Sequence, residues 1–361
     1  MSRASIALPM VAVAARLRRV AGRIAAASRR YDSSSLAVAR RVVALRARRI
    51  GLDEAFLSGA LDPRVPLERC ADFVGRRELL AVLRQFNVGA KDLVDDKAIF
   101  AVCAAGHGLP IARTLALVAP PFMVDGAGAS VHGEEAFLRW LRATPPSFVV
   151  KPAVGMGGRG VDVLERRGDE VTTVDRTLGV SALRARLCTA GAYGRAIVQE
   201  RLGNHASLAQ LSATDALQCT RMVTVATRTG DVELLFAFQK LIVGAHVIDN
   251  SVGNRTGNLV VAVDPARGTL GTAFGDGAPC PTHPVTGRAI AGFLLPHWSE
   301  ARALVARAAR CFRPLRAIGW DVALTETGPA LLEGNTEWVA FGGENGFWYS
   351  AGDLARLKGL L

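Results

Sequence analysis

The sequence has no apolar run long enough to cross a membrane and no cysteine spacing that suggests disulfides. Its longest uncharged apolar run extends from Ile6 to Ala15, whereas a transmembrane helix needs roughly 20 residues. The six cysteines are scattered without C-x-x-C spacing, which is typical of reduced thiols. Cys280 and His283 are spaced like half of a zinc site, but no second half accompanies them. These features favour a cytoplasmic protein, and the lack of a G-x-S-x-G elbow argues against a serine hydrolase.

Acidic residues are nearly absent from the N-terminal arm, which we define as residues 1–50. The arm holds twelve arginines, no lysine and one acid, Asp32, so it accounts for +11 of the net charge of +12. In the rest of the chain, 32 basic and 31 acidic residues almost cancel. Aromatic residues make up only 6% of the chain and are not interleaved with basic ones. We therefore expect no nucleic-acid partner.

The arm is rich in Ala, Val and Arg and is predicted to form one or two helices, with a flexible break at Ser33, Ser34 and Ser35. On a helix its residues separate into an apolar stripe and a basic face. The stripe comprises Val11, Ala14, Ala15, Leu17, Val20, Ile24 and Ala25, opposite Arg16, Arg19, Arg23 and Arg30. Three interpretations are open: peripheral contact with an anionic membrane, a solvated helix packed on the body, and a transit peptide.

A glycine-rich stretch between two apolar runs is the most informative part of the chain. Three apolar residues lead into Lys151 and Pro152, and an alternating apolar run resumes at Val161, which predicts a strand, a loop and a second strand. The loop carries Gly155, Gly157, Gly158 and Gly160. Glycines let successive backbone N–H groups approach one anion, and the lysine supplies a point charge suited to phosphate. We interpret residues 148–164 as a flap over nucleotide phosphates; the simpler alternative is a glycine-rich hairpin with a surface lysine.

Three familiar phosphate motifs do not fit this stretch. A dinucleotide fingerprint must open a helix, but here a strand continues after Gly160. A P-loop lysine follows the glycines, whereas Lys151 precedes them. A protein kinase would add H-R-D and D-F-G motifs further along the chain, and neither occurs.

Further candidate site residues occur before and after the flap. Asp95 and Asp96 precede Lys97 and an apolar run, which predicts a helix that begins at Lys97. A lysine in the first turn opposes the helix dipole, so we expect it to face an anion. Residues 196–202 are predicted to form a strand that turns polar. Residues 220–227 and 234–241 are predicted to pair as a hairpin, followed by a polar loop of the kind that binds substrates, residues 249–258.

A second hairpin near the C-terminus carries two acids. A strand from Gly319 to Thr325 and a return strand to Asn335, joined by a three-residue loop centred on Thr327, would place Asp321 opposite Glu333. Like charges in this position repel unless something binds between them. Two carboxylates and the amide oxygen of Asn335 form a donor set suited to Mg²⁺ beside phosphates. The alternative is a pair of exposed acids on a surface hairpin.

Together these segments resemble the ATP-grasp superfamily, from about Asp95 to the C-terminus. The order of the parts agrees: a lysine at a helix start, a Lys-Pro strand with a glycine flap, a Gln-Glu hinge, and an Asp … Glu-x-Asn hairpin. The chain is most similar to the sugar-transfer-associated, α-L-glutamate ligase-like group of that superfamily. The residues that match this group's pattern are Asp96-Lys97, Thr220-Arg221, Asp249-Asn250, His283-Pro284 … Gly287 and Gly319-Trp320-Asp321 … Glu333-Gly334-Asn335.

The resemblance implies an α+β fold in which two subdomains, residues 95–200 and 201–361, clasp ATP. They would follow the arm and a helical N-terminal region, residues 51–94. By resemblance, the ATP-binding residues are Lys97, Lys151, Gly155, Gly157, Gly158 and Gly160 for the phosphates, and Gln199, Glu200, Arg201 and Leu202 for the adenine. Asp321, Glu333 and Asn335 would hold Mg²⁺, with Mn²⁺ as an alternative.

The implied activity is that of a ligase that joins a small-molecule carboxylate to an amine or related nucleophile through an acyl phosphate, releasing ADP and phosphate, in polysaccharide or secondary-metabolite modification. Arg221 and Lys240 are candidate catalytic residues, since two cations there would stabilise charge on the transferred group. One alternative is a small-molecule kinase that uses the same site. Another is a non-catalytic nucleotide-binding protein, although such a protein would be expected to lose the phosphate and metal ligands.

Two departures from the superfamily pattern concern the site. Glu337 follows Asn335 closely, where many members have a proline-glycine turn, so it could join or crowd the metal site. The region before residue 90 is too short and too helical for the usual N-terminal α/β domain. We expect residues 342–346, which are rich in glycine, to compensate at the acceptor site.

Overall fold

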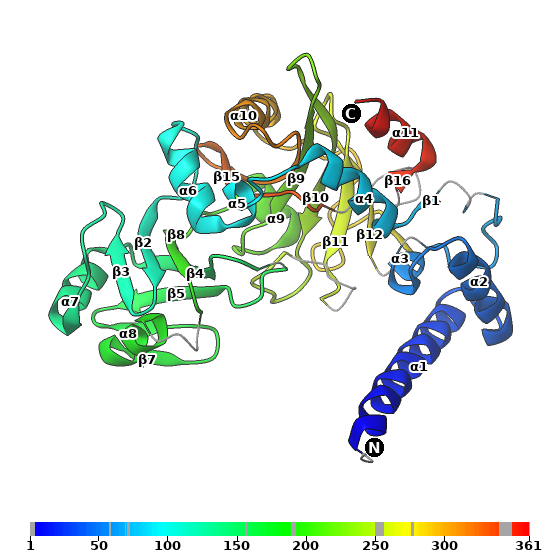
Figure 1. The fold of residues 1–361 in the computed structure, drawn as a ribbon, viewed down its shortest axis with the longest axis horizontal. Coiled ribbons are helices and arrows are strands. Elements are labelled where there is room, and N and C mark those ends of the chain that lie inside the picture. Colours follow the sequence, from blue (N-terminus) through cyan, green and yellow to red (C-terminus); the bar gives the residue numbers. More distant parts are fainter. Residues whose placement is uncertain are drawn as a thin grey trace.

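The computed structural model describes most of the 361-residue chain. The described residues are 4–57, 59–68, 70, 73–155, 157–188, 193–249, 256–275, 278–338 and 349–360. Two lobes, each built on a seven-stranded sheet, lie side by side, and helices of the arm stand beyond the second lobe (Figure 1). Two segments that the sequence suggested for substrate binding, 250–255 and 342–346, lie outside the described residues.

The first lobe is an antiparallel sheet with the strand order β3-β2-β8-β4-β5-β6-β7. Its strands are β2 (Thr114–Ala119), β3 (Phe122–Asp125), β4 (Ser147–Pro152), β5 (Asp162–Arg167), β6 (Glu170–Thr172), β7 (Thr177–Gly179) and β8 (Ala196–Glu200). Helices α7 (Gly133–Ala143) and α8 (Val180–Cys188) cover one face, where they share a buried core with Phe148 and Val150 of β4. Because side chains alternate along a strand, Lys151 points to the opposite face.

The second lobe is also antiparallel, with the order β13-β12-β11-β10-β9-β14-β15. Its strands are β9 (Cys219–Ala226), β10 (Val232–Leu241), β11 (Leu259–Val263), β12 (Leu270–Gly275), β13 (Ala278–Cys280), β14 (Ala317–Thr325) and β15 (Gly328–Asn335). The predicted pairing of β9 with β10 is therefore confirmed. Helix α10 (Trp298–Cys311) packs on one face against a core that includes Phe312 and Trp320.

The other face of the second sheet is divided between packing and charge. Helices α4 (Arg76–Phe86) and α11 (Ala351–Gly359) cover Val223 and Val225 of β9. Arg221 is two residues before Val223 on β9, so its side chain is on the same face of the sheet, just beyond the part that the helices cover. This sheet therefore presents a charged surface where its apolar cover ends. A short pair, β1 (Phe73–Val74) with β16 (Tyr349–Ser350), lies next to these helices.

Helix α6 (Lys97–Gly106) begins at the predicted residue. The Asp96 side chain caps it by accepting hydrogen bonds from the N–H groups of Ala98 (2.9 Å) and Ile99 (3.1 Å). Helix α5 (Asp92–Asp95) precedes it, and α9 (Ala206–Ser212) follows the hinge. Although residues 95–106 were grouped with the first subdomain, Phe100 stacks on Phe312 at 5.3 Å between ring centroids and so joins the core of the second lobe.

The C-terminal hairpin has the predicted pairing of acids but a different turn. Asp321 is the cross-strand partner of Glu333, as expected. The loop, however, contains two residues rather than three, because Thr325 pairs with Gly328. A bulge next to Asp321 adds the missing residue on β15 and restores the register. The sequence reasoning was thus wrong about the turn and right about the pair.

The arm forms two helices, α1 (Ala4–Arg30) and α2 (Ser35–Ala47), and α3 (Leu52–Leu57) follows them. Ser34 caps α2 by accepting a hydrogen bond from the Ala37 N–H (3.2 Å), so the serine break is the start of a helix. The end of α1 packs with α2 and α3 around Leu45 and Phe56 in a small core of their own. Within the described part of the chain, every helix is too short or too polar to span a bilayer. The observed α+β lobes preceded by helices agree with the fold class expected from the sequence.

Candidate active site

Three charged residues lie in one row across the second sheet. Arg221 on β9 is the cross-strand partner of Asp321 on β14, which in turn pairs with Glu333 on β15. The Arg221 guanidinium donates two hydrogen bonds to Asp321, Nε to Oδ1 at 2.5 Å and Nη2 to Oδ2 at 3.0 Å. Such a bidentate pair fixes both side chains. Arg221, a predicted catalytic residue, and Asp321, a predicted metal ligand, therefore bind each other directly.

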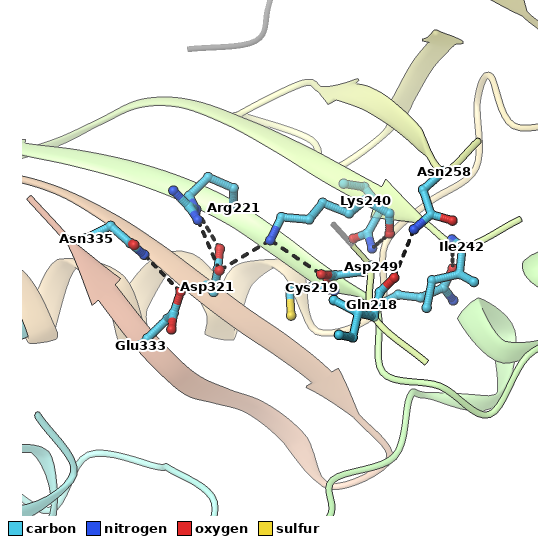
Figure 2. Close-up of polar contacts among 12 residues, drawn as sticks. Gln218, Cys219, Arg221, Lys240, Ile242, Asp249, Asn258, Asp321, Glu333 and Asn335 are labelled. Carbon is cyan, nitrogen blue, oxygen red and sulfur yellow. Dashed lines mark hydrogen bonds and ion pairs between the residues drawn. The ribbon is translucent and has the colours of Figure 1, made fainter. Parts of the chain in front are cut away.

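Lys240 extends this row toward the loop after β10 (Figure 2). Its Nζ lies 3.2 Å from Asp321 Oδ2 and 3.7 Å from Asp249 Oδ1. Asp249 is anchored in turn, because its Oδ2 accepts a hydrogen bond from the Cys219 N–H at 2.7 Å. Asp249 was expected in a substrate-binding loop and as part of the family pattern, but its contact with Lys240 was not anticipated from the sequence.

The buried charges of this network stabilise one another. Burial raises the pKa of Asp321, but the adjacent Arg221 and Lys240 outweigh that effect and hold the pKa well below its usual range. Burial lowers the pKa of Lys240, whereas Asp249 and Asp321 more than compensate, so that the pKa is raised. The pKa of Arg221 is also raised by Asp321, despite burial. All these groups are consequently ionised at neutral pH.

Lys97 connects the second lobe to the flap. Its Nζ donates to the carbonyl oxygen of Gly155 at 2.9 Å and lies 3.2 Å from Glu333 Oε2. The Lys97 and Glu333 side chains are 13% and 24% exposed. The two acids of the hairpin are thus compensated separately, Asp321 by Arg221 and Lys240 and Glu333 by Lys97. Their opposition across the strands does not by itself require a metal between them.

Lys151 reaches the same region from the first lobe. Burial lowers the pKa of its ammonium group, Glu333 raises that pKa, and the charge of Lys97 lowers it further. The net shift is downward, which is expected for a cation that lacks a full complement of negative charge. An anion that bound beside Lys151 would reverse this shift.

The flap passes over these charges with its glycines in backbone conformations that other residues rarely adopt. Gly155, Gly157, Gly158 and Gly160 have φ angles of +149°, +75°, +69° and +74°. A Cβ added to Gly158 would lie 2.5 Å from Cγ2 of Ile248, in the loop after β10. The flap of one lobe therefore touches the second lobe so closely that a side chain at position 158 would require Ile248 to shift.

The hinge residues are the last two of β8, Gln199 and Glu200, and the two that follow it, Arg201 and Leu202. Gln199 is buried and donates from Nε2 to the carbonyl oxygen of Ala112 at 3.1 Å. The Glu200 carboxylate accepts a hydrogen bond from the Arg113 N–H at 3.0 Å. Arg201 joins the lobes through Glu165 on β5 and Asp215, each 2.9 Å away. These side chains fix the shape of the hinge through contacts within the protein.

A cleft of about 530 Å³ opens beside the hinge on the α10 side. Its lining includes Ile111, Glu200, Leu202, Leu304 and Pro329. The cleft is not lined by the three residues of the charged row, Arg221, Asp321 and Glu333, or by Lys240 beside them. Leu202 thus lines a cleft on the α10 side and does not lie among the cations of the charged site.

The oxygen donors present fit a Mg²⁺ ion in their chemistry. Asn335 donates from Nδ2 to Glu333 Oε1 at 3.3 Å, which holds its side-chain amide beside that carboxylate (Figure 2). Asp321, Glu333 and Asn335 would supply two carboxylates and one amide oxygen. Among the described residues no cluster of three His, Cys, Asp or Glu side chains could hold a metal. Cys280 instead donates to the Thr282 carbonyl oxygen at 3.1 Å, in keeping with the chance spacing of Cys280 and His283.

Two neighbours of the metal-ligand hairpin have structural partners. Glu337 Oε1 lies 3.1 Å from Nη2 of Arg84 on α4, so its side chain is directed to α4. Thr336 donates its N–H and hydroxyl to Asp95, at 2.8 Å and 2.6 Å, which ties the end of β15 to α5. Asp95 was expected only as a helix cap, and the adjacent acids Asp95 and Asp96 turn out to have different tasks.

Several solved enzyme structures resemble this chain at low identity. They include the biotin carboxylase domain of 2-oxoglutarate carboxylase from Hydrogenobacter thermophilus with MgADP, ADP and bicarbonate (14% identity, 68% of this chain and 40% of that one, TM-score 0.39). An ADP complex of N5-carboxyaminoimidazole ribonucleotide synthetase (12%, 67% and 45%, TM-score 0.39) and an L-amino acid ligase from Bacillus licheniformis (11%, 68% and 41%, TM-score 0.38) are also similar. The matched region spans less than half the length of each of these proteins.

No curated protein matches the chain. The family model described as "Sugar-transfer associated ATP-grasp" matches residues 83–344, a region that contains both sheets, the flap and every charged residue of the site. The expectation drawn from the flap, the hinge and the Asp … Glu-x-Asn hairpin is thereby confirmed, and the chain belongs to the sugar-transfer-associated ATP-grasp family.

Proposed function

We propose that the protein is an ATP-dependent ligase that activates a carboxylate as an acyl phosphate and joins it to an amine or a related nucleophile. One observation carries the proposal. Four cations, Lys97, Lys151, Arg221 and Lys240, come together with three carboxylates beneath a glycine flap. The remaining positive charge favours an anionic ligand such as a nucleotide triphosphate.

In this proposal one pair of cations binds the ATP phosphates and the other pair faces the phosphoryl group that is transferred. Lys97 and Lys151, next to the flap, bind the ATP phosphates, and the flap N–H groups cover them. Asp321, Glu333 and Asn335 hold Mg²⁺ or Mn²⁺, which when bound neutralises phosphate charge. Arg221 and Lys240 then face the transferred phosphoryl group, where their charges stabilise the negative charge that develops.

The reaction requires positioning more than a covalent residue. A carboxylate oxygen of the acid attacks the γ-phosphorus, its bond to phosphorus forms as the bond to ADP breaks, and an acyl phosphate results. The nucleophile then attacks the acyl carbon, phosphate leaves, and the amine gives up a proton. The flap excludes water that would otherwise hydrolyse the acyl phosphate.

Isothermal titration of ATP, with and without Mg²⁺, tests the nucleotide site. We expect binding that Mg²⁺ strengthens, and loss of the Mg²⁺ effect in Glu333→Gln and Asn335→Ala, with thermal melting to show that both variants fold. NADP⁺ serves as the control nucleotide. Binding of NADP⁺ in place of ATP would mean that the flap has been misinterpreted.

Hydroxylamine tests the ligase chemistry. With a panel of small carboxylic acids and ATP, an acyl phosphate should be trapped as a hydroxamate while ADP and phosphate are released. ADP formation that needs no nucleophile and leaves a stable phosphorylated product would support a kinase instead. ATP binding without turnover across the panel would favour a non-catalytic role.

A further inference from the structure

Helix α1 presents an isolated basic surface at one end of the molecule. It runs from Ala4 to Arg30 and contains no acidic residue in its first turn, while Arg29 and Arg30 end it. It projects away from both lobes, on the side of the second lobe opposite the first (Figure 1). The charge of this helix therefore does not contribute to the nucleotide site.

The C-terminal part of α1 is held firmly. Ala27 and Tyr31 are buried in the small core shared with α2 and α3. The guanidinium of Arg23 stacks over the ring of Phe56 at 4.3 Å from its centroid. The remainder of α1 thus leaves the protein in a fixed direction.

The apolar stripe of α1 continues past this core onto the surface. Leu17, Val20 and Ile24 are spaced by three and four residues and so lie on one helical face. Ile24 packs on the small core, whereas Leu17 is 64% exposed. The apolar stripe of α1 is therefore packed on the core at Ile24 and exposed to solvent at Leu17, nearer the start of the helix.

Three arginines on the side of α1 away from this stripe have no acidic partner among the described residues. Arg18, Arg19 and Arg29 are exposed and form no ion pair with any described residue. On α2, Arg40 and Arg46 are likewise exposed and unpaired within the described part of the chain. Asp32 is the one acid in the whole arm.

We propose that this arm surface binds an anionic lipid bilayer, with the apolar stripe at the level of the acyl chains and the arginines on the headgroups. A helix with an apolar stripe on one side and arginines on the other fits a lipid interface, in which both kinds of side chain are satisfied at once. A nucleic acid would satisfy only the charges, since the arm lacks aromatic residues interleaved with arginine. The arm would hold the enzyme at a membrane through a helix that projects away from both lobes (Figure 1).

Co-sedimentation of the full chain with lipid vesicles tests this proposal. The vesicles are phosphatidylcholine alone or with phosphatidylglycerol, at about 50 mM and about 500 mM NaCl. We expect binding only to the anionic vesicles and much weaker binding at high salt. Arg18→Gln/Arg19→Gln/Arg29→Gln should weaken binding about 100-fold, since the loss of each basic residue costs about fivefold.

A charge-preserving control makes the result specific. Arg18→Lys/Arg19→Lys/Arg29→Lys should bind anionic vesicles nearly as well as the wild type, and Leu17→Gln should weaken binding without changing its salt dependence. ATP titration of each variant should be unchanged, because α1 lies away from the site. Equal binding of the Gln and wild-type chains, equal binding to neutral vesicles, or release from vesicles by an equal charge of oligonucleotide would overturn the proposal.

Discussion

Arginine is used in opposite ways at the two ends of this molecule. In the second lobe, Arg221 is buried, is locked to Asp321 by two hydrogen bonds, and has its charge balanced within the protein. In the arm, Arg18 and Arg19 are exposed and have no acidic partner among the described residues. A buried, paired charge fixes the positions of the side chains around it, whereas an exposed, unpaired charge attracts anions over a longer range, an attraction that salt weakens. The +12 net charge therefore says little about the site, which lies in a nearly neutral body.

Removal of the shared acid should have the largest effect. Asp321→Asn leaves Arg221 buried without its paired carboxylate and Lys240 with Asp249 alone, and it should lower the free energy of unfolding by about 3–5 kcal/mol. Urea denaturation measures this change. The matched control is Glu135→Gln, which breaks an ion pair with Arg139 in which the Glu135 side chain is 89% exposed. That variant should unfold like the wild type, and an equal loss in both would contradict the contrast between buried and exposed charge.

The small core of the arm should unfold separately from the lobes. Leu45→Ala removes a buried side chain that contacts only the arm cluster and should destabilise that cluster by about 2–5 kcal/mol. Trypsin should then cleave after Arg41, which is buried in the wild type, at least about 30-fold faster. Leu36→Ala is the control, because Leu36 is 62% exposed. A lower urea midpoint for the lobes in Leu45→Ala would show that the two parts are coupled.

Contact between the flap and Ile248 should appear as an intermediate effect. Gly158→Ala places a Cβ against Ile248 and should lower kcat/KM for ATP by about tenfold, or about 1.4 kcal/mol. Gly168→Ala is the control, since its φ of +63° is similar but a Cβ there meets nothing within 4 Å. Adding Ile248→Ala to Gly158→Ala should restore part of the loss. A similar loss at Gly168 would assign the effect to backbone strain alone.

The pH dependence of ATP binding should show a smaller effect. Burial and Lys97 lower the pKa of Lys151 in the free protein, and bound phosphate would raise it again. ATP binding would then take up a proton, so the affinity should fall as pH rises from the lowered pKa toward about 10.4, by at most about tenfold per pH unit. Titration calorimetry at a series of pH values measures this slope. Lys151→Arg should flatten it, and an unchanged slope in that variant would assign it to another group.

Local signals in the sequence were sufficient for much of the fold. The acid pair before Lys97 marked the start of α6, and the alternation in residues 220–227 and 234–241 predicted the pairing of β9 with β10. The pairing of Asp321 with Glu333 followed from alternation along two strands. The two-residue turn and its compensating bulge did not, because the bulge depends on packing across the sheet, which adjacent residues do not encode.

The site was predictable in its members but not in their contacts. We identified Lys97, Lys151, Arg221 and Lys240 as cations near phosphate, but no local signal indicated that Arg221 pairs with Asp321, 100 positions away. The same holds for Asp249, whose partner Lys240 is on β10, and for Glu337, which turns to Arg84. Contacts of this kind arise from tertiary packing, so the electrostatic state of the site required the structure.

Lys97 gives the flap a thermodynamic link to whatever binds beneath it. One ammonium group donates to the Gly155 carbonyl oxygen and pairs with Glu333. A ligand that draws Lys97 toward its own negative charge must change both contacts together. The site must therefore bind that ligand with a different affinity when the flap is held by Lys97 than when it is released. Because such coupling is reciprocal, the ligand would shift the equilibrium between held and released flap by the same factor by which release of the flap changes the ligand affinity. A single side chain would thus convert occupancy of the site into motion of the loop above it.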